Sequence, residues 1–309
     1  MPLISRRLQD KLFAPLTLLS ALWLRKVRAN IKSMPVSKRA LLKAGVFPIL
    51  DRYWEPLFDP RHLRHSLRDD RHLPGLDLNI RGQLELLRKL VFASELSEGV
   101  SFNYENGNFE AGDAEFLYAI IRYYKPKRIV EIGSGHSTRM AMKAVNANRA
   151  EDSRYSCEHI CIEPYECPWL DTMDIALIRR PVEEVDKKVF SDLDRGDLLF
   201  IDSSHMVRPQ GDVLYEIMEI LPQLVSGVII HFHDIFTPKD YPDEWLRDEV
   251  RFWNEQYILE AFLSYNEKFK VIAALNYLKH HHLEELVRVC PILKNSSQKE
   301  PGSIYLVRI

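Results

Sequence analysis

The stretch Val130-Glu131-Ile132-Gly133-Ser134-Gly135-His136-Ser137-Thr138 decides the fold. Its apolar start, its two closely spaced glycines and its polar continuation predict a strand, a tight turn and the beginning of a helix. Paired glycines let the backbone approach a ligand closely, and in open α/β sheets ligands bind outside the carboxyl ends of the strands. The segment therefore predicts a cofactor loop.

Strand-like and helix-like segments alternate around this loop. Helices are predicted over residues 114–124, from Ser137 onward, over 213–221 and over 244–265. Strands are predicted over residues 128–132, 159–163, 175–178, 197–202, 228–234, 270–275 and 304–309. Continuous apolar strands separated by helices are typical of a parallel sheet covered on both faces. The predicted fold class is therefore α/β, with a doubly wound, mostly parallel sheet of about seven strands.

The composition is that of a globular protein, with 309 residues, 46% hydrophobic and 28% charged. This length predicts one substantial domain over residues 109–309, preceded by a helical segment over 1–50 and a connector over 51–108. Four cysteines and no recognisable signal peptide predict a cytoplasmic protein.

The N-terminal segment is strongly basic. Residues 1–50 hold ten of the 42 Lys and Arg residues but only one of the 44 acids, Asp10. The acidic remainder argues against nucleic acid as a partner of the main domain. The apolar run over residues 13–24 is too short to span a bilayer. It predicts either a peripheral contact with the membrane through residues 1–32 or a helix docked on the body or on another subunit.

Two acids distinguish the predicted cofactor. Glu131 stands two residues before the first glycine, and Thr138 replaces the third glycine of a dinucleotide fingerprint. A carboxylate there repels a pyrophosphate but attracts S-adenosylmethionine, which carries a sulfonium and an ammonium group and no phosphate. Glu163 ends the second strand, where an acid can accept hydrogen bonds from ribose hydroxyls. A nicotinamide-dependent oxidoreductase is the alternative that these acids disfavour.

Acids and histidines also end the fourth and fifth strands. Because neighbouring strands end at one edge, Asp202 and Asp234 are predicted to meet beside the cofactor and to hold a divalent cation. Carboxylates alone suit Mg²⁺, whereas His205 or His233 as further ligands would favour Mn²⁺ or another transition ion. Without a metal, His205 or His233 is the candidate general base for an acceptor hydroxyl. His231 shares a strand face with His233, so spacing leaves open which of them faces the substrate.

These residues resemble class I methyltransferases, and more narrowly the bacterial group with a type 24 methyltransferase domain. The resemblance extends from about Phe109 to the C-terminus, through the glycine loop and the motifs Phe200-Ile201-Asp202-Ser203-Ser204-His205 and His231-Phe232-His233-Asp234. It departs from the commonest pattern at Ile235, because there a second acid or amide usually follows the acid at the end of the fifth strand.

The resemblance implies a last strand that is antiparallel and transfer of a methyl group to a small molecule or a glycan. By position, Glu131 and the loop would hold the methionine part of S-adenosylmethionine, and Glu183 would approach the adenine. The loop residues concerned are Gly133, Ser134, Gly135, Ser137 and Thr138, and the cofactor set also includes Asp202 and Ser203. Asp202, His205 and His233 are the catalytic candidates. A non-catalytic, membrane-associated scaffold that keeps the fold is a further alternative, against which Asp202, His205 and Asp234 argue.

Overall fold

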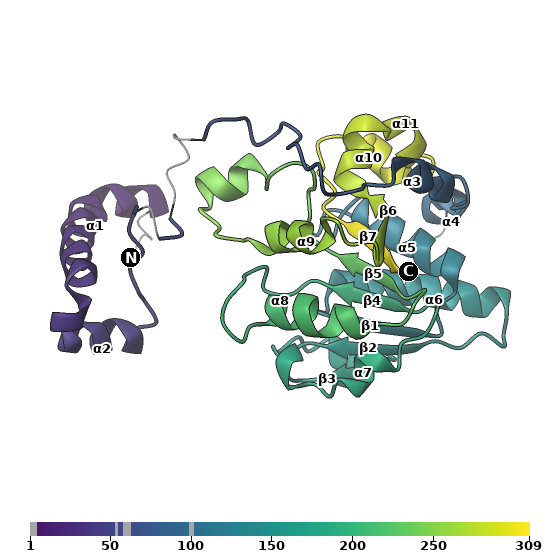
Figure 1. The fold of residues 1–309 in the computed structure, drawn as a ribbon, viewed down its shortest axis with the longest axis horizontal. Helices are drawn as coiled ribbons and strands as arrows, with labels where there is room; N and C mark the ends of the chain where they lie inside the picture. The colour runs from purple at the N-terminus through teal and green to yellow at the C-terminus, as the bar shows by residue number, and fades with distance from the viewer. Residues whose placement is uncertain (1–4, 53–54, 58–62, 99–101) are drawn as a thin grey trace. The chain divides into compact units, whose positions relative to one another are not determined.

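The computed structural model describes residues 5–52, 55–57, 63–98 and 102–309 (Figure 1). The chain divides into two units, Met1–Ser66 and Leu67–Ile309. The larger unit contains the glycine loop and every other predicted site residue.

The larger unit is built on a single seven-stranded sheet, in the order β3-β2-β1-β4-β5-β7-β6 (Figure 1). Only β7 is antiparallel to its neighbours, β5 and β6. The strands are β1 (Arg128–Ile132), β2 (Glu158–Ile162), β3 (Ala176–Ile178), β4 (Leu198–Ile201), β5 (Ile229–Phe232), β6 (Phe269–Ala274) and β7 (Ile304–Arg308). The predicted fold class, a doubly wound and mostly parallel seven-stranded sheet with an antiparallel last strand, is confirmed.

Helices cover both faces of this sheet, because side chains alternate along each strand. On one face, Ile129 and Phe200 pack in a buried cluster with residues of α5 (Asp113–Tyr124) and α6 (His136–Glu151). On the other face, Val130 and Leu199 pack with Val213 of α8 (Asp212–Tyr215) and Leu259 of α9 (Glu255–Leu263). Shorter helices complete the unit: α7 (Lys188–Ser191), α10 (Leu275–His281), α11 (Leu283–Leu286) and α12 (Pro291–Asn295).

The segment predicted as a connector contributes to this unit from Leu67 onward. Its helices are α3 (Ile80–Leu87) and α4 (Ala93–Glu98). Gln83 is fully buried, and its side-chain oxygen accepts a hydrogen bond of 2.8 Å from the backbone N–H of Ala274 at the end of β6. The buried leucines of α3 lie in the same core cluster as α5. Residues 67–108 are therefore integral to the main domain.

The prediction of one helix over residues 244–265 is wrong. The chain forms a helical turn over Glu244–Asp248, leaves the helical path, and starts again as α9 at Glu255. Val250 has a positive φ of 54°, a backbone conformation that a β-branched residue adopts only when its surroundings impose it. At the restart, the backbone N–H groups of Asn254 and Glu255 donate to the carbonyl of His205. The break in the helix therefore places the start of α9 against His205, a residue of the site described below.

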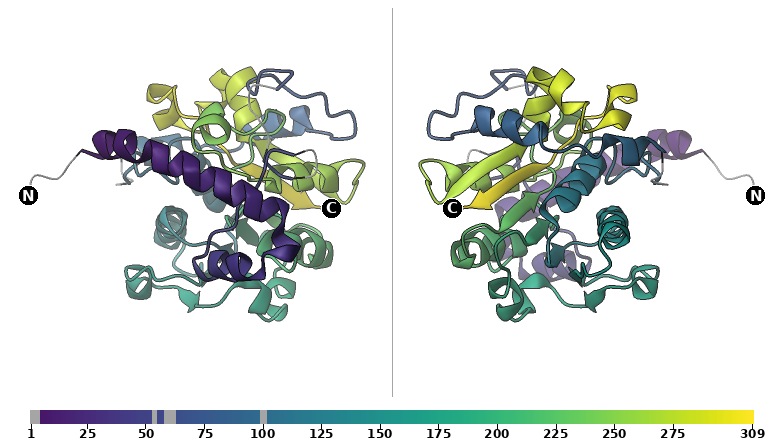
Figure 2. Two further views of the ribbon diagram at one scale, coloured as in Figure 1. Left: turned by 90° about the vertical axis from the view of Figure 1, so that its left-hand side faces the viewer. Right: turned by 90° about the vertical axis from the view of Figure 1, so that its right-hand side faces the viewer.

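The smaller unit contains α1 (Arg6–Ala29) and α2 (Pro35–Lys43). Figure 2 shows α1 as one long helix. Within the unit, Arg28 forms a 2.7 Å ion pair with Glu55. None of the helices in the described part of the chain is both long enough and apolar enough to cross a membrane.

Candidate functional site

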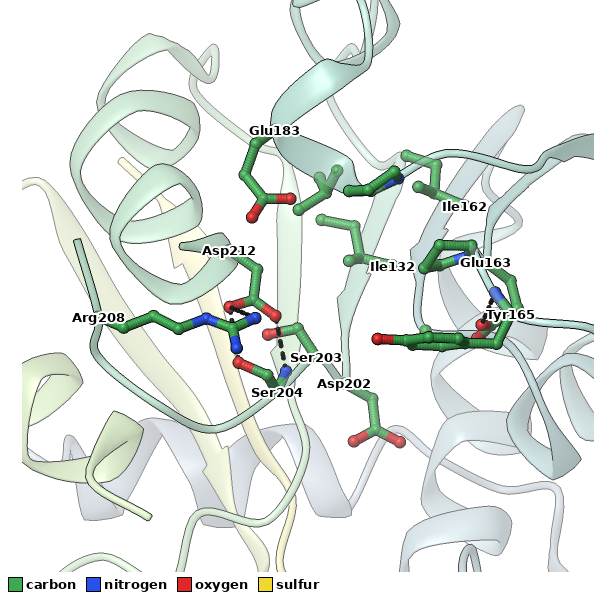
Figure 3. A pocket seen from close by; sticks show the side chains of 14 residues that line it. Ile132, Ile162, Glu163, Tyr165, Glu183, Asp202, Ser203, Ser204, Arg208 and Asp212 are labelled. Atoms are coloured by element: carbon green, nitrogen blue, oxygen red, sulfur yellow. Dashed lines mark hydrogen bonds and ion pairs between the residues drawn. The ribbon is translucent and has the colours of Figure 1, made fainter. Parts of the chain in front are cut away.

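A cavity of about 430 Å³ opens at the carboxyl ends of β1, β2 and β4, where the strand order reverses (Figure 3). In doubly wound sheets this reversal point is where ligands bind. Five predicted residues line the cavity: Gly133, Glu163, Glu183, Asp202 and Ser203. The remaining lining residues are Ile132, Ile162, Pro164, Tyr165, Pro181, Val182, Ser204, Arg208 and Asp212.

The glycine turn is shaped by its contact with the end of β4. Gly133 has φ of 77°, and a Cβ atom built on it would lie only 1.8 Å from the backbone oxygen of Asp202. Neither the conformation nor the space admits a side chain. Gly135 differs, since a Cβ there would meet no atom within 4 Å. The first glycine therefore closes β1 against β4, and the second leaves open space above the turn.

Glu163 holds the turn from the side of β2. Its carboxylate accepts a hydrogen bond of 3.2 Å from the backbone N–H of Ser134 and one of 2.9 Å from that of Tyr165. The predicted contact of Glu163 with a ribose stays a prediction, as does that of Glu183 with an adenine. Both side chains lie at the cavity wall (Figure 3), which both predictions require.

Glu131 does not line the cavity. Its side chain is 1% exposed and lies beneath the turn, on the face of the sheet that α6 covers. It accepts hydrogen bonds from Ser137 Oγ at 2.6 Å and contacts His159 Nε2 at 2.9 Å. Thr138 is buried too, and its hydroxyl accepts from the N–H of Gly135 at 3.1 Å. These residues support the turn from below, so the geometry offers them no direct contact with a ligand in the cavity.

Two carboxylates and two imidazoles meet at the ends of β4 and β5. His205 Nε2 lies 3.4 Å from Asp202 Oδ1 and 3.5 Å from Asp234 Oδ2. His233 Nδ1 lies 3.5 Å from Asp202 and 3.5 Å from Asp234. His205 and Asp234 have φ values of 59° and 57°, so both backbones are held in the sparsely populated left-handed region. The sequence predicted that these four residues converge, and the structure brings all of them together; below they are called the Asp-His cluster.

Glu255 and Trp253, which sequence reasoning did not single out for the site, hold His205 in place. Glu255 is 1% exposed, and its carboxylate accepts a 2.8 Å hydrogen bond from His205 Nδ1. The ring of Trp253 lies against the imidazole, with centroids 4.1 Å apart. With Nδ1 bonded to Glu255, the other ring nitrogen of His205 faces Asp202 and Asp234. The missed signal was the short polar run after Trp253, which was predicted to lie inside a helix.

The pKa values of the Asp-His cluster reflect burial opposed by neighbouring charges. Burial alone would lower the pKa of His205, but contacts with Asp202 and Glu255 raise it well above the usual value. Burial also opposes protonation of His233, yet Asp234 and Asp202 raise its pKa well above normal. Burial would raise the pKa of Asp202, but His233 and His205 lower it. Burial raises the pKa of Asp234 in spite of His233.

His231 has a different role from His233. It is fully buried, its Nε2 lies 2.8 Å from Ser303 Oγ, and its ring stacks on Phe200 with centroids 4.2 Å apart. Burial, with the charge of His233, lowers the pKa of His231 well below the usual value. His231 is therefore a buried core residue, and of the two histidines only His233 lies within 3.5 Å of both Asp202 and Asp234.

Two more acids adjoin the Asp-His cluster. Asp113 is the first residue of α5, and Gly112 precedes the helix as its cap. The Asp113 carboxylate accepts from the N–H of Gly302 at 3.2 Å and lies 3.9 Å from His233 Nε2. Glu216 is fully buried and accepts from Ser203 Oγ at 3.0 Å; burial and the charge of Glu255 raise its pKa well above normal. No local sequence pattern marks either acid, because their partners lie far along the chain.

Comparisons with known proteins agree with this architecture. Residues 130–235 match the family model described as a methyltransferase domain. An uncharacterized protein of Archaeoglobus fulgidus is 35% identical over 142 residues, which are 41% of this chain and 62% of that protein. The chain thus spans less than two thirds of that relative's length. An O-methyltransferase from Bacillus cereus, solved in complex with SAH, is 12% identical and covers 74% of this chain and 90% of its own, with a TM-score of 0.37.

The fold is assigned from strand order and the domain match, because that TM-score is low. A doubly wound sheet with an antiparallel seventh strand and a glycine turn at the reversal point defines a class I S-adenosylmethionine-dependent methyltransferase domain. Residues 130–235 match the model of the type 24 methyltransferase domain. The resemblance inferred from the sequence is confirmed.

Proposed function

We propose that this protein transfers the methyl group of S-adenosylmethionine to a hydroxyl group of a small molecule or a glycan, assisted by a divalent metal ion. The observation that carries the proposal is the position of Asp202. This residue lines the cofactor cavity and also contributes its carboxylate to the Asp-His cluster. The predicted donor site and the predicted acceptor site therefore share one side chain.

The charge of the cavity wall favours S-adenosylmethionine over a dinucleotide. Glu163, Glu183, Asp202 and Asp212 line it, against the single cation Arg208, which lies 3.9 Å from Asp212. Such a wall attracts a sulfonium and an ammonium group and repels a pyrophosphate. The electrostatic argument first made for Glu131 thus applies to these four acids. The apolar wall formed by Ile132, Ile162 and Val182 suits the flat face of an adenine.

The Asp-His cluster fits a metal ion. Direct charge-assisted hydrogen bonds are about 2.7–2.9 Å long, whereas its four separations are 3.4–3.5 Å. Asp202, His233 and Asp234 each offer one ligand atom, and these three atoms lie within 4.8 Å of one another. Nδ1 of His233 is buried and has no hydrogen-bond partner among the described residues. One imidazole with two carboxylates, and a second imidazole, His205, beside them, would favour Mn²⁺ or another first-row ion over Mg²⁺.

In the proposed reaction, the residues of the Asp-His cluster and those around it have different roles. When bound there, a divalent ion lowers the pKa of an acceptor hydroxyl, which a displacement at carbon needs. Asp202, Asp234, His205 and His233 hold and orient the acceptor end of the site. Glu255 orients His205 through Nδ1. The contact between Gly133 and Asp202 fixes the cofactor loop against this end, which aligns donor and acceptor for in-line displacement.

The test is labelled methyl transfer from S-adenosylmethionine into fractionated small molecules and glycans of a cell extract. The full chain is assayed as purified, with a chelator, and with Mn²⁺ or Mg²⁺ added back. We expect label that survives mild alkaline hydrolysis, as an ether does and an ester does not, and activity that the chelator abolishes and Mn²⁺ restores best. Alkali-labile label, or transfer that the chelator leaves unchanged, would overturn the acceptor or the metal assignment respectively.

Cofactor choice is tested separately by calorimetry. Binding of reduced nicotinamide dinucleotide without binding of S-adenosylmethionine would favour the nicotinamide-dependent oxidoreductase over the methyltransferase. Binding of S-adenosylmethionine without any methyl transfer would favour the non-catalytic scaffold. We also propose that the reaction takes place in the cytoplasm, since all four cysteines are free thiols.

A further inference from the structure

Helix α1 carries a continuous row of exposed apolar side chains. Leu8, Leu12, Leu16, Leu19 and Trp23 are between 50% and 65% exposed. At 100° per residue, the five side chains fall within an arc of about 80° around the helix axis. A water-soluble surface helix normally turns such a stripe toward a core. Within its own unit, this stripe covers about four turns and stays exposed.

The other side of α1 and the neighbouring helix are basic. Arg7 and Arg25 lie on the side opposite the apolar row, Lys11 lies on its flank, and α2 adds Lys38, Arg39 and Lys43. The only acid in residues 1–50 is Asp10. This part of the chain therefore combines one apolar stripe with a large excess of positive charge.

We propose that α1 binds in the plane of an anionic lipid bilayer, with Leu8, Leu12, Leu16, Leu19 and Trp23 inserted at the boundary between headgroups and acyl chains. The basic side chains then lie at the level of the anionic headgroups, which is the arrangement of interfacial helices. Trp23, with an apolar ring and a polar N–H, suits this boundary. The helix is too polar to cross the bilayer, in keeping with the absence of any spanning helix from the described residues.

Charge decides between this occupant and a second copy of the chain. Two copies of α1 packed along their apolar rows would bring two basic helices together, with only Asp10 of each to offset the repulsion. Helices that pair in water usually flank their apolar seam with charges of both signs. An anionic lipid surface has the complementary charge and gains about fivefold in affinity for each Lys or Arg near it.

The helix supplies its own matched control. Leu18 is 61% exposed, as Leu12 is, but lies about 120° from the centre of the apolar row. Leu19 is 65% exposed and lies within the row. Leu18→Glu and Leu19→Glu add the same charge to adjacent positions of one helix. Any difference between the two variants therefore reports insertion of the apolar row and not a change in net charge.

The test is flotation of the full chain with vesicles of phosphatidylcholine alone and of phosphatidylcholine mixed with phosphatidylglycerol. We expect binding to the mixed vesicles, and binding to phosphatidylcholine alone that is weaker by tenfold or more. Leu18→Glu should weaken the binding by about fivefold, the electrostatic cost of one charge. Leu19→Glu should weaken it by about a further tenfold, because a Leu side chain is no longer buried. Affinity for S-adenosylmethionine serves as the control for folding.

Equal losses in the two variants would overturn insertion, and no binding to anionic vesicles would overturn the whole proposal. A dimer seen by light scattering that Leu19→Glu dissociates, without vesicle binding, would instead assign the row to a second copy. Vesicle binding does not depend on methyl transfer, so failure of the proposed function would leave this result readable.

Discussion

Glu255 gives the sharpest test of the metal assignment, because it touches no predicted substrate and acts only through His205. The 2.8 Å hydrogen bond joins two side chains that are 8% and 1% exposed, so solvent cannot replace it. Changing a partner that orients a metal-bound histidine typically costs about 10–100-fold in metal affinity. Glu255→Gln keeps an acceptor oxygen, and we expect about a tenfold loss of Mn²⁺ affinity. Glu255→Ala removes the acceptor, and we expect a loss near about a hundredfold.

The assay is Mn²⁺ titration of the full chain by calorimetry, with kcat measured at saturating Mn²⁺. Because Glu255 orients a ligand and does not contact the acceptor, kcat should recover largely when Mn²⁺ is raised. Glu260→Gln is the matched control, since Glu260 lies on the same helix and is also buried, but pairs with Arg71 and Thr237. It should lower thermal stability without changing the Kd for Mn²⁺. If Glu255→Ala folds and binds Mn²⁺ as tightly as the wild type, His205 is not a ligand.

Five other substitutions test the cofactor loop and its junction with the Asp-His cluster. Gly133→Ala should abolish S-adenosylmethionine binding and lower the melting temperature, since its Cβ would lie 1.8 Å from the Asp202 oxygen, whereas Gly135→Ala, with open space around it, should fold normally. Glu131→Ala should lower the free energy of unfolding by about 3 kcal/mol, because Ser137 and His159, both buried, lose the carboxylate they contact. Glu163→Ala should weaken cofactor binding with a smaller change in the free energy of unfolding. Calorimetry measures the loss of cofactor affinity in each variant, and thermal unfolding measures the loss of stability. Asp202→Asn keeps the backbone oxygen that packs on Gly133, so it should retain cofactor affinity within about threefold and lose about 100-fold or more in kcat; a large loss of cofactor affinity instead would place its charge chiefly on the donor.

The sheet could be predicted almost completely from the sequence. Seven apolar segments gave seven strands, with boundaries that shift by one or two residues, because strands buried on both faces cannot tolerate polar interruptions. The helix over 244–265 could not be predicted correctly. Its apolar spacing fits a helix throughout, and the break is imposed by distant contacts: Asn254 accepts a 2.6 Å hydrogen bond from the N–H of Val207, and its own N–H binds the carbonyl of His205.

The difference between local patterns and distant contacts also explains which site residues could be predicted. Neighbouring strand ends predicted the meeting of Asp202 with Asp234, since parallel strands end at one edge of a sheet. Strand alternation also bears on Glu131, which shares a face with Ile129 and therefore lies with α6 below the turn. Motif position predicts a direct contact with the cofactor, whereas in the structure the Glu131 side chain is buried and is not among the residues that line the cavity. The support from Glu255 comes from fifty residues beyond His205, so the polar run after Trp253 could not by itself show which side chain it contacts.

Asp202 connects the glycine turn with the Asp-His cluster. Its backbone oxygen occupies the space that a side chain at position 133 would need, so the end of β4 sets the position of the cofactor turn. Its carboxylate faces both histidines of the Asp-His cluster, so the same residue sets the position of the acceptor end. A methyl donor that is already activated requires alignment more than further chemical activation. Under the proposed function, one residue at the end of β4 would hold donor and acceptor in line through the rigidity of the sheet, and the cavity and the Asp-His cluster would then act as one site.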